Sequence, residues 1–138
     1  MLWILLSVGI LITLSDQLSV HVFKNVFLRY RPTHNLNLEG LVHTVNEYYG
    51  GQYGFISSHA ANTFALATFI SLLLQKHYKY ITVLLFAWAA FISYSRIYLG
   101  VHYPADVAVG ALFGTALALA VYKFYIYSMN RFIKTEHE

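Results

Sequence analysis

The chain has 138 residues, of which 58% are hydrophobic and only 11% are charged; its formal net charge is +3 and it has no cysteine. So few charges could not cover the surface of a soluble domain of this size, and so many apolar residues exclude an intrinsically disordered chain. The absence of cysteine excludes disulfide frameworks and thiolate metal sites. The basic residues are too few and too scattered to form a nucleic-acid-binding face.

Four apolar stretches, taken in chain order, predict membrane-spanning helices. They cover about residues 1–22, 55–74, 80–94 and 105–127, and the third is short. A helix that crosses the hydrocarbon core needs about 20 apolar residues. Four such stretches indicate an all-α, multi-pass transmembrane helix bundle that forms a single domain over residues 1–138. The first stretch lacks a basic leader and a small-residue cleavage site, so we expect no cleavable signal peptide.

Two polar segments, at about residues 21–54 and 95–104, separate these stretches and hold most of the unusual residues. Leucines and valines at helical spacing predict a short interfacial helix at about residues 38–48. If the N-terminus is cytoplasmic, the basic turn at residues 75–79 and the C-terminal tail are cytoplasmic too, as the positive-inside tendency prefers. Both polar segments then lie on the opposite face of the membrane.

Polar and charged residues recur at the ends of the predicted spans on that face. Lys24 and Arg31 lie near the end of the first span. Ser57, Ser58 and His59 open the second span, where free backbone N–H groups and the helix dipole favour an anion.

The third and fourth spans complete the cluster. Arg96 closes the third span, and His102 and Asp106 stand four residues apart across the start of the fourth. This spacing lets the carboxylate accept a hydrogen bond from the imidazole. Cations, hydroxyls and a helix N-terminus suit a tetrahedral oxyanion, and two histidines, one held by a carboxylate, suit acid–base or nucleophilic chemistry.

Three motifs occur in a fixed order: KNVFLRYRP fits K-x6-R-P, SSH fits the core of P-S-G-H, and SRIYLGVHYPAD fits S-R-x5-H-x3-D. Together they resemble the type 2 phosphatidic acid phosphatase (PAP2) superfamily, which shares its phosphate pocket with vanadium haloperoxidases. The resemblance extends from about Lys24 to the end of the fourth span. It implies a PAP2/haloperoxidase-like core with about four membrane spans in this chain.

The chain departs from the family pattern in two respects. Ile56 and Ser58 stand where the family has Pro and Gly. The Ser58 backbone N–H can still bind phosphate, but its side chain is expected to crowd the pocket. Family members commonly have six transmembrane helices, so the first two are expected to be absent, either in a fragment or in a short member.

The resemblance implies a role for each motif residue. His102 would attack phosphorus and form a phosphohistidine, Asp106 would hold its imidazole in the nucleophilic tautomer, and His59 would protonate the leaving group. The implied phosphate clamp consists of Lys24, Arg31, Ser57, Ser58 and Arg96. No metal ion or other cofactor is expected, because the fixed cations would do the work of Mg²⁺.

The implied activity is that of a membrane-embedded lipid phosphatase acting on a phosphomonoester or a diphosphate. Phosphatidic acid, phosphatidylglycerol phosphate, undecaprenyl diphosphate and lipid A phosphate all remain open as substrates. The expected partners are this substrate and membrane lipids, with no nucleic acid, and the sequence leaves the oligomeric state open. The compact size and short loops suggest a bacterial enzyme of the inner membrane, and the orientation set by the basic residues places its site on the periplasmic face.

Two other functions fit parts of the pattern. A vanadate-dependent haloperoxidase is disfavoured because those relatives are soluble. A catalytically silent phospholipid-binding or transport subunit is disfavoured because binding alone needs cations but no nucleophile.

Several polar residues fall outside the motifs. Arg29 is expected to contact headgroups or solvent rather than join the clamp. Asp16, near the outer end of the first span, is expected either to support the pocket from behind or to contact a missing helix. Structural or surface positions are expected for the other histidines: His21, His34, His43, His77 and His137.

Overall fold

The computed structural model describes the backbone of residues 2–135 and the side chains of residues 2–131. Met1, which belongs to the first predicted span, and His137 lie outside the described residues.

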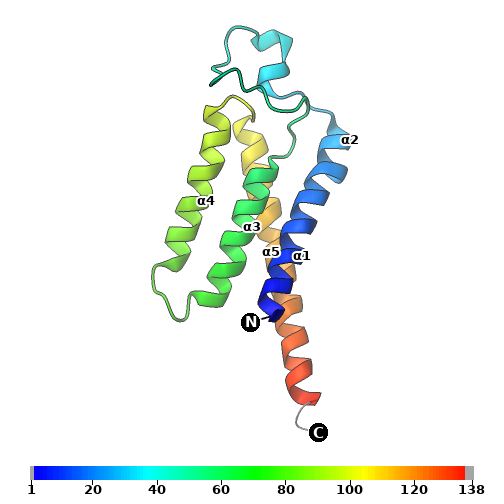
Figure 1. Ribbon diagram of the computed structural model, residues 1–138, viewed down its shortest axis with the longest axis vertical. Coiled ribbons are helices and arrows are strands. Elements are labelled where there is room, and N and C mark those ends of the chain that lie inside the picture. Colours follow the sequence, from blue (N-terminus) through cyan, green and yellow to red (C-terminus); the bar gives the residue numbers. More distant parts are fainter. Residues whose placement is uncertain (1, 136–138) are drawn as a thin grey trace.

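Four long helices form the bundle in Figure 1, and the only strand-like pairing among residues 2–135 is an isolated bridge between Tyr30 and Tyr53. The long helices are α1 (Leu2–Leu18), α3 (Ser58–Leu74), α4 (Ile81–Tyr98) and α5 (Pro104–Thr135). Helix α1 continues through a π-helical turn (Ser19–Lys24) into the short helix α2 (Asn25–Phe27), and we call this continuous segment the α1 rod. The prediction of an all-α helix bundle is confirmed.

Within residues 2–135, three helical segments are long and apolar enough to cross a membrane. They are Leu2–Phe27, Ile81–Tyr98 and Pro104–Arg131. The remaining predicted span forms α3, which is apolar but has only 17 residues. It starts later than predicted because Ser57 has an extended backbone, and its hydroxyl caps the helix by accepting the Ala60 N–H at 3.4 Å.

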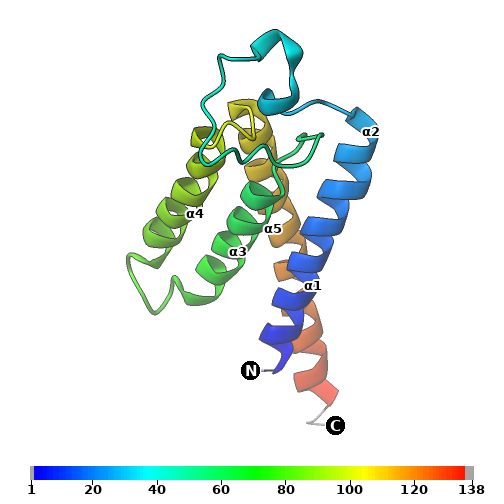
Figure 2. The ribbon, with the colours of Figure 1, turned by 45° about the horizontal axis from the view of Figure 1, so that its top comes forward.

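Helix α3 lies among the other helices and contacts α1, α4 and α5 (Figures 1 and 2). Glycines of α5 permit the closest of these approaches. A Cβ atom at Gly110 would lie 2.6 Å from the Ser57 carbonyl oxygen, and one at Gly114 would overlap the carbonyl oxygen of Ala61. These contacts hold the N-termini of α3 and α5 side by side.

Residues 28–57 form a cap over the end of the bundle at which α3 and α5 begin (Figures 1 and 2). The predicted helix at residues 38–48 is wrong. Gly40, Asn46 and Glu47 have φ angles of 75°, 50° and 57°, which a right-handed helix cannot contain. The cap instead contains two short 3₁₀ helices, Pro32–His34 and Leu36–Leu38.

Candidate active site

The predicted site residues belong to elements that meet at one end of the bundle, beneath the cap. Figure 1 shows the first turns of α3 and α5, the last turn of α4 and the end of the α1 rod at this end. Backbone hydrogen bonds join the start of α3 to α5, and the segment before α5 to α4. The Ser57 N–H donates to the Asp106 carbonyl oxygen at 3.0 Å, and the His102 N–H donates to the Arg96 carbonyl oxygen at 3.3 Å.

A chain of hydroxyl groups fixes Lys24 against the start of α3. The Lys24 ammonium donates to the Ser58 hydroxyl at 2.7 Å, and the Ser58 and Ser19 hydroxyls lie 2.6 Å apart. The Ser19 hydroxyl donates its hydrogen to the Asp16 carbonyl oxygen at 2.8 Å. In its contact with Ser58 it can therefore only accept, so the Ser58 hydroxyl is the donor. The Ser58 side chain, which replaces the family glycine, therefore serves as the partner of Lys24.

The π-helical turn brings Ser19 and Lys24 to the same partner, since they stand at its first and last positions. Turns of this kind occur frequently at functional sites. Ser19 was not identified from the sequence, because apolar periodicity does not reveal a change from α- to π-helical winding. The Asp16 charge acts on the Lys24 ammonium, while its backbone carbonyl oxygen accepts the Ser19 hydroxyl.

His102 and Asp106 are the most deeply buried ionisable pair of the site. Their side chains are 2% and 1% exposed, and His102 Nδ1 lies 3.6 Å from Asp106 Oδ2. This separation exceeds a hydrogen bond, so the bond predicted from the four-residue spacing is not formed. Asp106 Oδ2 instead accepts the backbone N–H of Tyr103 at 2.9 Å. His102 Nδ1 has no hydrogen-bond partner among the described residues.

Arg29 is the second partner of Asp106. Its guanidinium donates to Asp106 Oδ1 at 2.8 Å and lies 4.3 Å from the centre of the Tyr103 ring. The Arg29 side chain is 42% exposed, so the expected surface position is compatible with the structure; the ion pair with Asp106 is an additional contact that the sequence did not indicate. Tyr30, which lies between Arg29 and Arg31, pairs with Tyr53 in an isolated bridge. Side chains two residues apart lie on the same side of an extended backbone, so the R-x-R spacing is the signal that could have suggested a role for Arg29.

Glycines of the cap make room for Arg31 beside His102. A Cβ atom at Gly54 would lie 2.8 Å from Arg31 Cγ and 3.5 Å from His102 Nδ1, and one at Gly50 would lie 2.7 Å from an Arg31 guanidinium nitrogen. Arg31 Nε also donates to the Tyr53 carbonyl oxygen at 3.2 Å. The glycine-rich segment therefore positions the guanidinium, a role that its sequence alone does not indicate.

Arg96 and His59 complete the cluster. Arg96 donates to the Tyr48 hydroxyl at 3.3 Å, while its Nε atom is buried without a hydrogen-bond partner among the described residues. His59 is exposed on the first turn of α3. The charges of Arg96, Lys24 and Arg31 and the imidazole of His102 all act on it.

The site combines several cations with a buried imidazole. Burial lowers the pKa of His102 below its ordinary value, and Arg31 adds to this effect while Asp106 opposes it. The site contains four cations and one carboxylate: Arg29 pairs with Asp106, Arg31 also acts on Asp106, and Lys24, Arg31 and Arg96 act on His59. Among residues 2–131, no group of three or more His, Cys, Asp or Glu side chains could hold a metal ion. The arrangement suits an anion such as phosphate.

Comparisons with known proteins point to the same chemistry. The sequence model of the PAP2 superfamily matches residues 1–130. A lipid A 4'-phosphatase of Porphyromonas gingivalis is 39% identical over 132 residues, which cover 96% of this chain and 55% of that protein. A lipid A 4'-phosphatase of Bacteroides thetaiotaomicron is 38% identical over 109 residues, which cover 78% of this chain and 48% of that protein. The chain thus spans about half the length of these relatives, and no solved structure matches it significantly.

Proposed function

The chain belongs to the PAP2 superfamily, and on that premise we propose that it is a membrane-embedded phosphatase that hydrolyses a phosphate ester of a lipid. The observation that carries this proposal is the meeting of His102, Asp106 and four cations at one end of an apolar helix bundle. Of the substrates left open by the sequence, a lipid A phosphate is favoured, because both relatives are lipid A 4'-phosphatases.

His102 is the proposed nucleophile. Its Nδ1 atom faces Asp106, which leaves Nε2 to attack phosphorus. The Nε2 lone pair forms the P–N bond as the bond from phosphorus to the leaving oxygen breaks, and His59 gives that oxygen its proton. Water then attacks phosphorus, His59 accepts the water proton, and the P–N bond breaks to release phosphate.

Asp106 is the proposed orienting group for His102. Arg29 and the Tyr103 N–H hold its two oxygens, so the carboxylate has a fixed direction before substrate binds. The distance of 3.6 Å to His102 Nδ1 would shorten as the imidazole gains positive charge during attack, since catalytic hydrogen bonds often tighten only in the complex.

The phosphate clamp proposed from the motifs has donors available for it. The backbone N–H groups of Ser58 and His59 have no hydrogen-bond partner among the described residues, as expected for the first N–H groups of a helix. The buried Arg96 Nε atom is likewise unpaired within residues 2–131. Lys24 and Arg31 would supply the remaining positive charge, which stabilises the oxygens of the transferring phosphoryl group.

The protein is an integral membrane protein, and we place its site at the periplasmic face of a bacterial inner membrane. This placement is supported by basic residues that stand away from the site, toward the opposite end of the bundle, as the positive-inside tendency requires. They are Lys76, Lys79, Lys123, Arg131 and Lys134. A pocket level with the headgroups reaches lipid phosphates without removing the lipid from the bilayer.

The test is phosphate release from lipid A 4'-phosphate, phosphatidic acid and undecaprenyl diphosphate in detergent with EDTA present. We expect release by the wild type, none by His102→Ala, and unchanged release by the matched control His77→Ala, which lies in the turn between α3 and α4. EDTA-sensitive release, or release that survives in His102→Ala, would contradict the proposal.

A further inference from the structure

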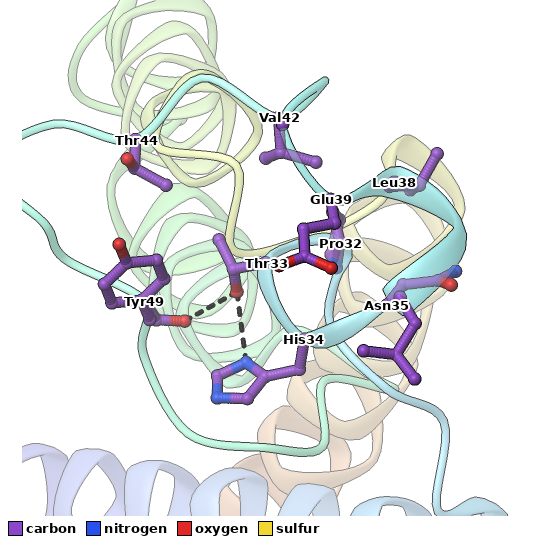
Figure 3. A pocket seen from close by; sticks show the side chains of 11 residues that line it. Pro32, Thr33, His34, Asn35, Leu38, Glu39, Val42, Thr44 and Tyr49 are labelled. Atoms are coloured by element: carbon purple, nitrogen blue, oxygen red, sulfur yellow. Dashed lines mark hydrogen bonds between the residues drawn. The ribbon is translucent and has the colours of Figure 1, made fainter.

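A cavity lies in the cap, outside the cluster of His102 and the cations. It has a volume of about 480 Å³, which is within the range of sites for small organic ligands. Its hydrogen-bonding walls come from Thr33, His34, Asn35, Glu39, Thr44 and Tyr49 (Figure 3).

The cavity adjoins the phosphate site through the backbone. Pro32 and Tyr49 line it, and their chain neighbours Arg31 and Gly50 contact each other, since a Cβ atom at Gly50 would lie 2.7 Å from the Arg31 guanidinium. A second link is the bond from the Asn35 amide to the Tyr103 hydroxyl at 3.0 Å, because Tyr103 directly follows His102. The part of a substrate attached to a phosphate that Arg31 binds would therefore lie close to this cavity.

The lining excludes two parts of a phospholipid. Among the described residues, no Lys or Arg lines the cavity, and it contains the Glu39 carboxylate, so a second phosphate would be repelled. An acyl chain would leave the polar walls without partners. The lining instead suits a sugar, which has both hydroxyl groups and apolar C–H faces. Its hydroxyl, carboxylate and imidazole groups could hydrogen-bond the sugar hydroxyls, and the apolar side chains of Leu38 and Val42 could contact the C–H faces.

The polar groups are arranged before any ligand binds. The Thr33 hydroxyl donates to the Tyr49 carbonyl oxygen at 2.7 Å and lies 3.2 Å from His34 Nδ1 (Figure 3). Because the Thr33 hydroxyl donates its hydrogen to Tyr49, it can only accept from His34, so His34 Nδ1 donates to Thr33. In the neutral ring, Nε2 then carries no hydrogen and remains an acceptor. The Glu39 carboxylate has no ion pair within the part of the chain that the structure describes. Both acceptors are thus available to hydroxyl or amide N–H groups.

We infer that this cavity is a subsite for the sugar that carries the scissile phosphate. The inference rests on the proposed function. It gives His34, which the sequence places only at a structural or surface position, a role in binding the substrate through its ring nitrogen. Glu39 and Thr44 are the further specificity residues, because their hydrogen-bonding side chains line the cavity and face the space that the sugar would occupy.

The test compares lipid A 4'-phosphate with phosphatidic acid, which has no sugar, in the purified protein. Glu39→Ala should raise KM for the glycolipid about tenfold, the loss expected for a hydrogen bond to a charged group, with kcat unchanged. Its kinetics on phosphatidic acid should not change. Thr44→Val should act in the same direction. The matched control is Glu47→Ala, another exposed carboxylate of the cap that does not line the cavity. Equal effects on both lipids, or none on the glycolipid, would overturn the inference.

A binding measurement separates this inference from the proposed function. Saturation-transfer NMR should detect a phosphate-free glucosamine disaccharide on the wild type and on Glu47→Ala, with the signal reduced in Glu39→Ala. If the protein binds the disaccharide in this way but releases no phosphate from any substrate, the proposed function is refuted and the inference of a sugar site stands. Phosphate release without disaccharide binding would refute the sugar site and retain the function.

Discussion

The contact of Gly110 with α3 predicts that one added methyl group will impair the reaction. A Cβ atom at position 110 would lie 2.6 Å from the Ser57 carbonyl oxygen, whereas ordinary contacts begin at 3.4 Å. The two backbones must therefore separate locally by about 0.8 Å in Gly110→Ala. That shift also stretches the bond of 3.0 Å between the Ser57 N–H and the Asp106 carbonyl oxygen.

The expected loss follows from the size of this displacement. Helix α3 supplies His59 and the free N–H groups, while α5 supplies Asp106, so their separation moves the acid and the clamp away from the nucleophile. A misplacement of about 1 Å can cost about 100-fold in rate, and we expect kcat to fall about 10- to 100-fold. Overpacking of this kind also costs roughly 1–3 kcal/mol of stability, so the thermal midpoint in detergent should fall.

The assay is the initial rate of phosphate release at saturating substrate, with thermal unfolding measured on the same preparations. Gly9→Ala is the matched control, because a Cβ atom at this helical glycine meets nothing within 4 Å. It should retain wild-type activity and stability. Wild-type kcat in a folded Gly110→Ala protein would refute the claim that the approach of α3 to α5 sets the site geometry.

The remaining predictions concern individual groups of the site. Burial lowers the pKa of His102 below 6.5, so the imidazole is neutral at pH 7 and its neutral, nucleophilic form is lost only as the pH falls through that lowered value. We therefore expect kcat/KM to fall on the acid side below pH 6.5. A fall in kcat/KM on the acid side that begins above pH 7 would contradict this. Arg29→Gln should lower kcat about tenfold or more with a smaller change in KM, because Asp106 loses a charge-assisted hydrogen bond. Arg29→Lys should recover part of the rate. Steady-state kinetics that show wild-type kcat in Arg29→Gln would exclude a role of Arg29 in positioning Asp106. His59→Ala should slow esters with poor leaving groups more than p-nitrophenyl phosphate, and equal losses for both substrates would remove His59 from the acid role.

Much of the bundle was predictable because hydrophobic length is a strong local signal. It identified the α1 rod, α4 and α5 as apolar helices, although the rod continues to Phe27 and α4 to Tyr98. The cap was not predictable in this way. Its course depends on positive φ angles at residues such as Asn46, which turn the backbone in a direction that the spacing of leucines and valines does not reveal.

The site was predictable where short motifs fix residue types and was missed where partners come from elsewhere in space. The motifs identified His102 and Asp106, but the partner of Asp106 is Arg29, which precedes it by 77 positions. Ser19 was missed because its role depends on the π-helical turn. The four-residue spacing predicted a His102–Asp106 hydrogen bond that is absent, because Tyr103 and Arg29 hold the carboxylate oxygens instead.

The most direct test of the proposed reaction is a search for phosphate on the protein during its first turnover. Lipid A labelled with ³²P at the 4'-phosphate is mixed with excess protein, and the reaction is quenched with alkali on the millisecond time scale. The wild type should carry transient label that is stable in alkali and released in acid, with its site mapped to His102, while His102→Ala carries none. Release of phosphate at the wild-type rate with no label on His102 at any time would contradict the nucleophilic role of this histidine.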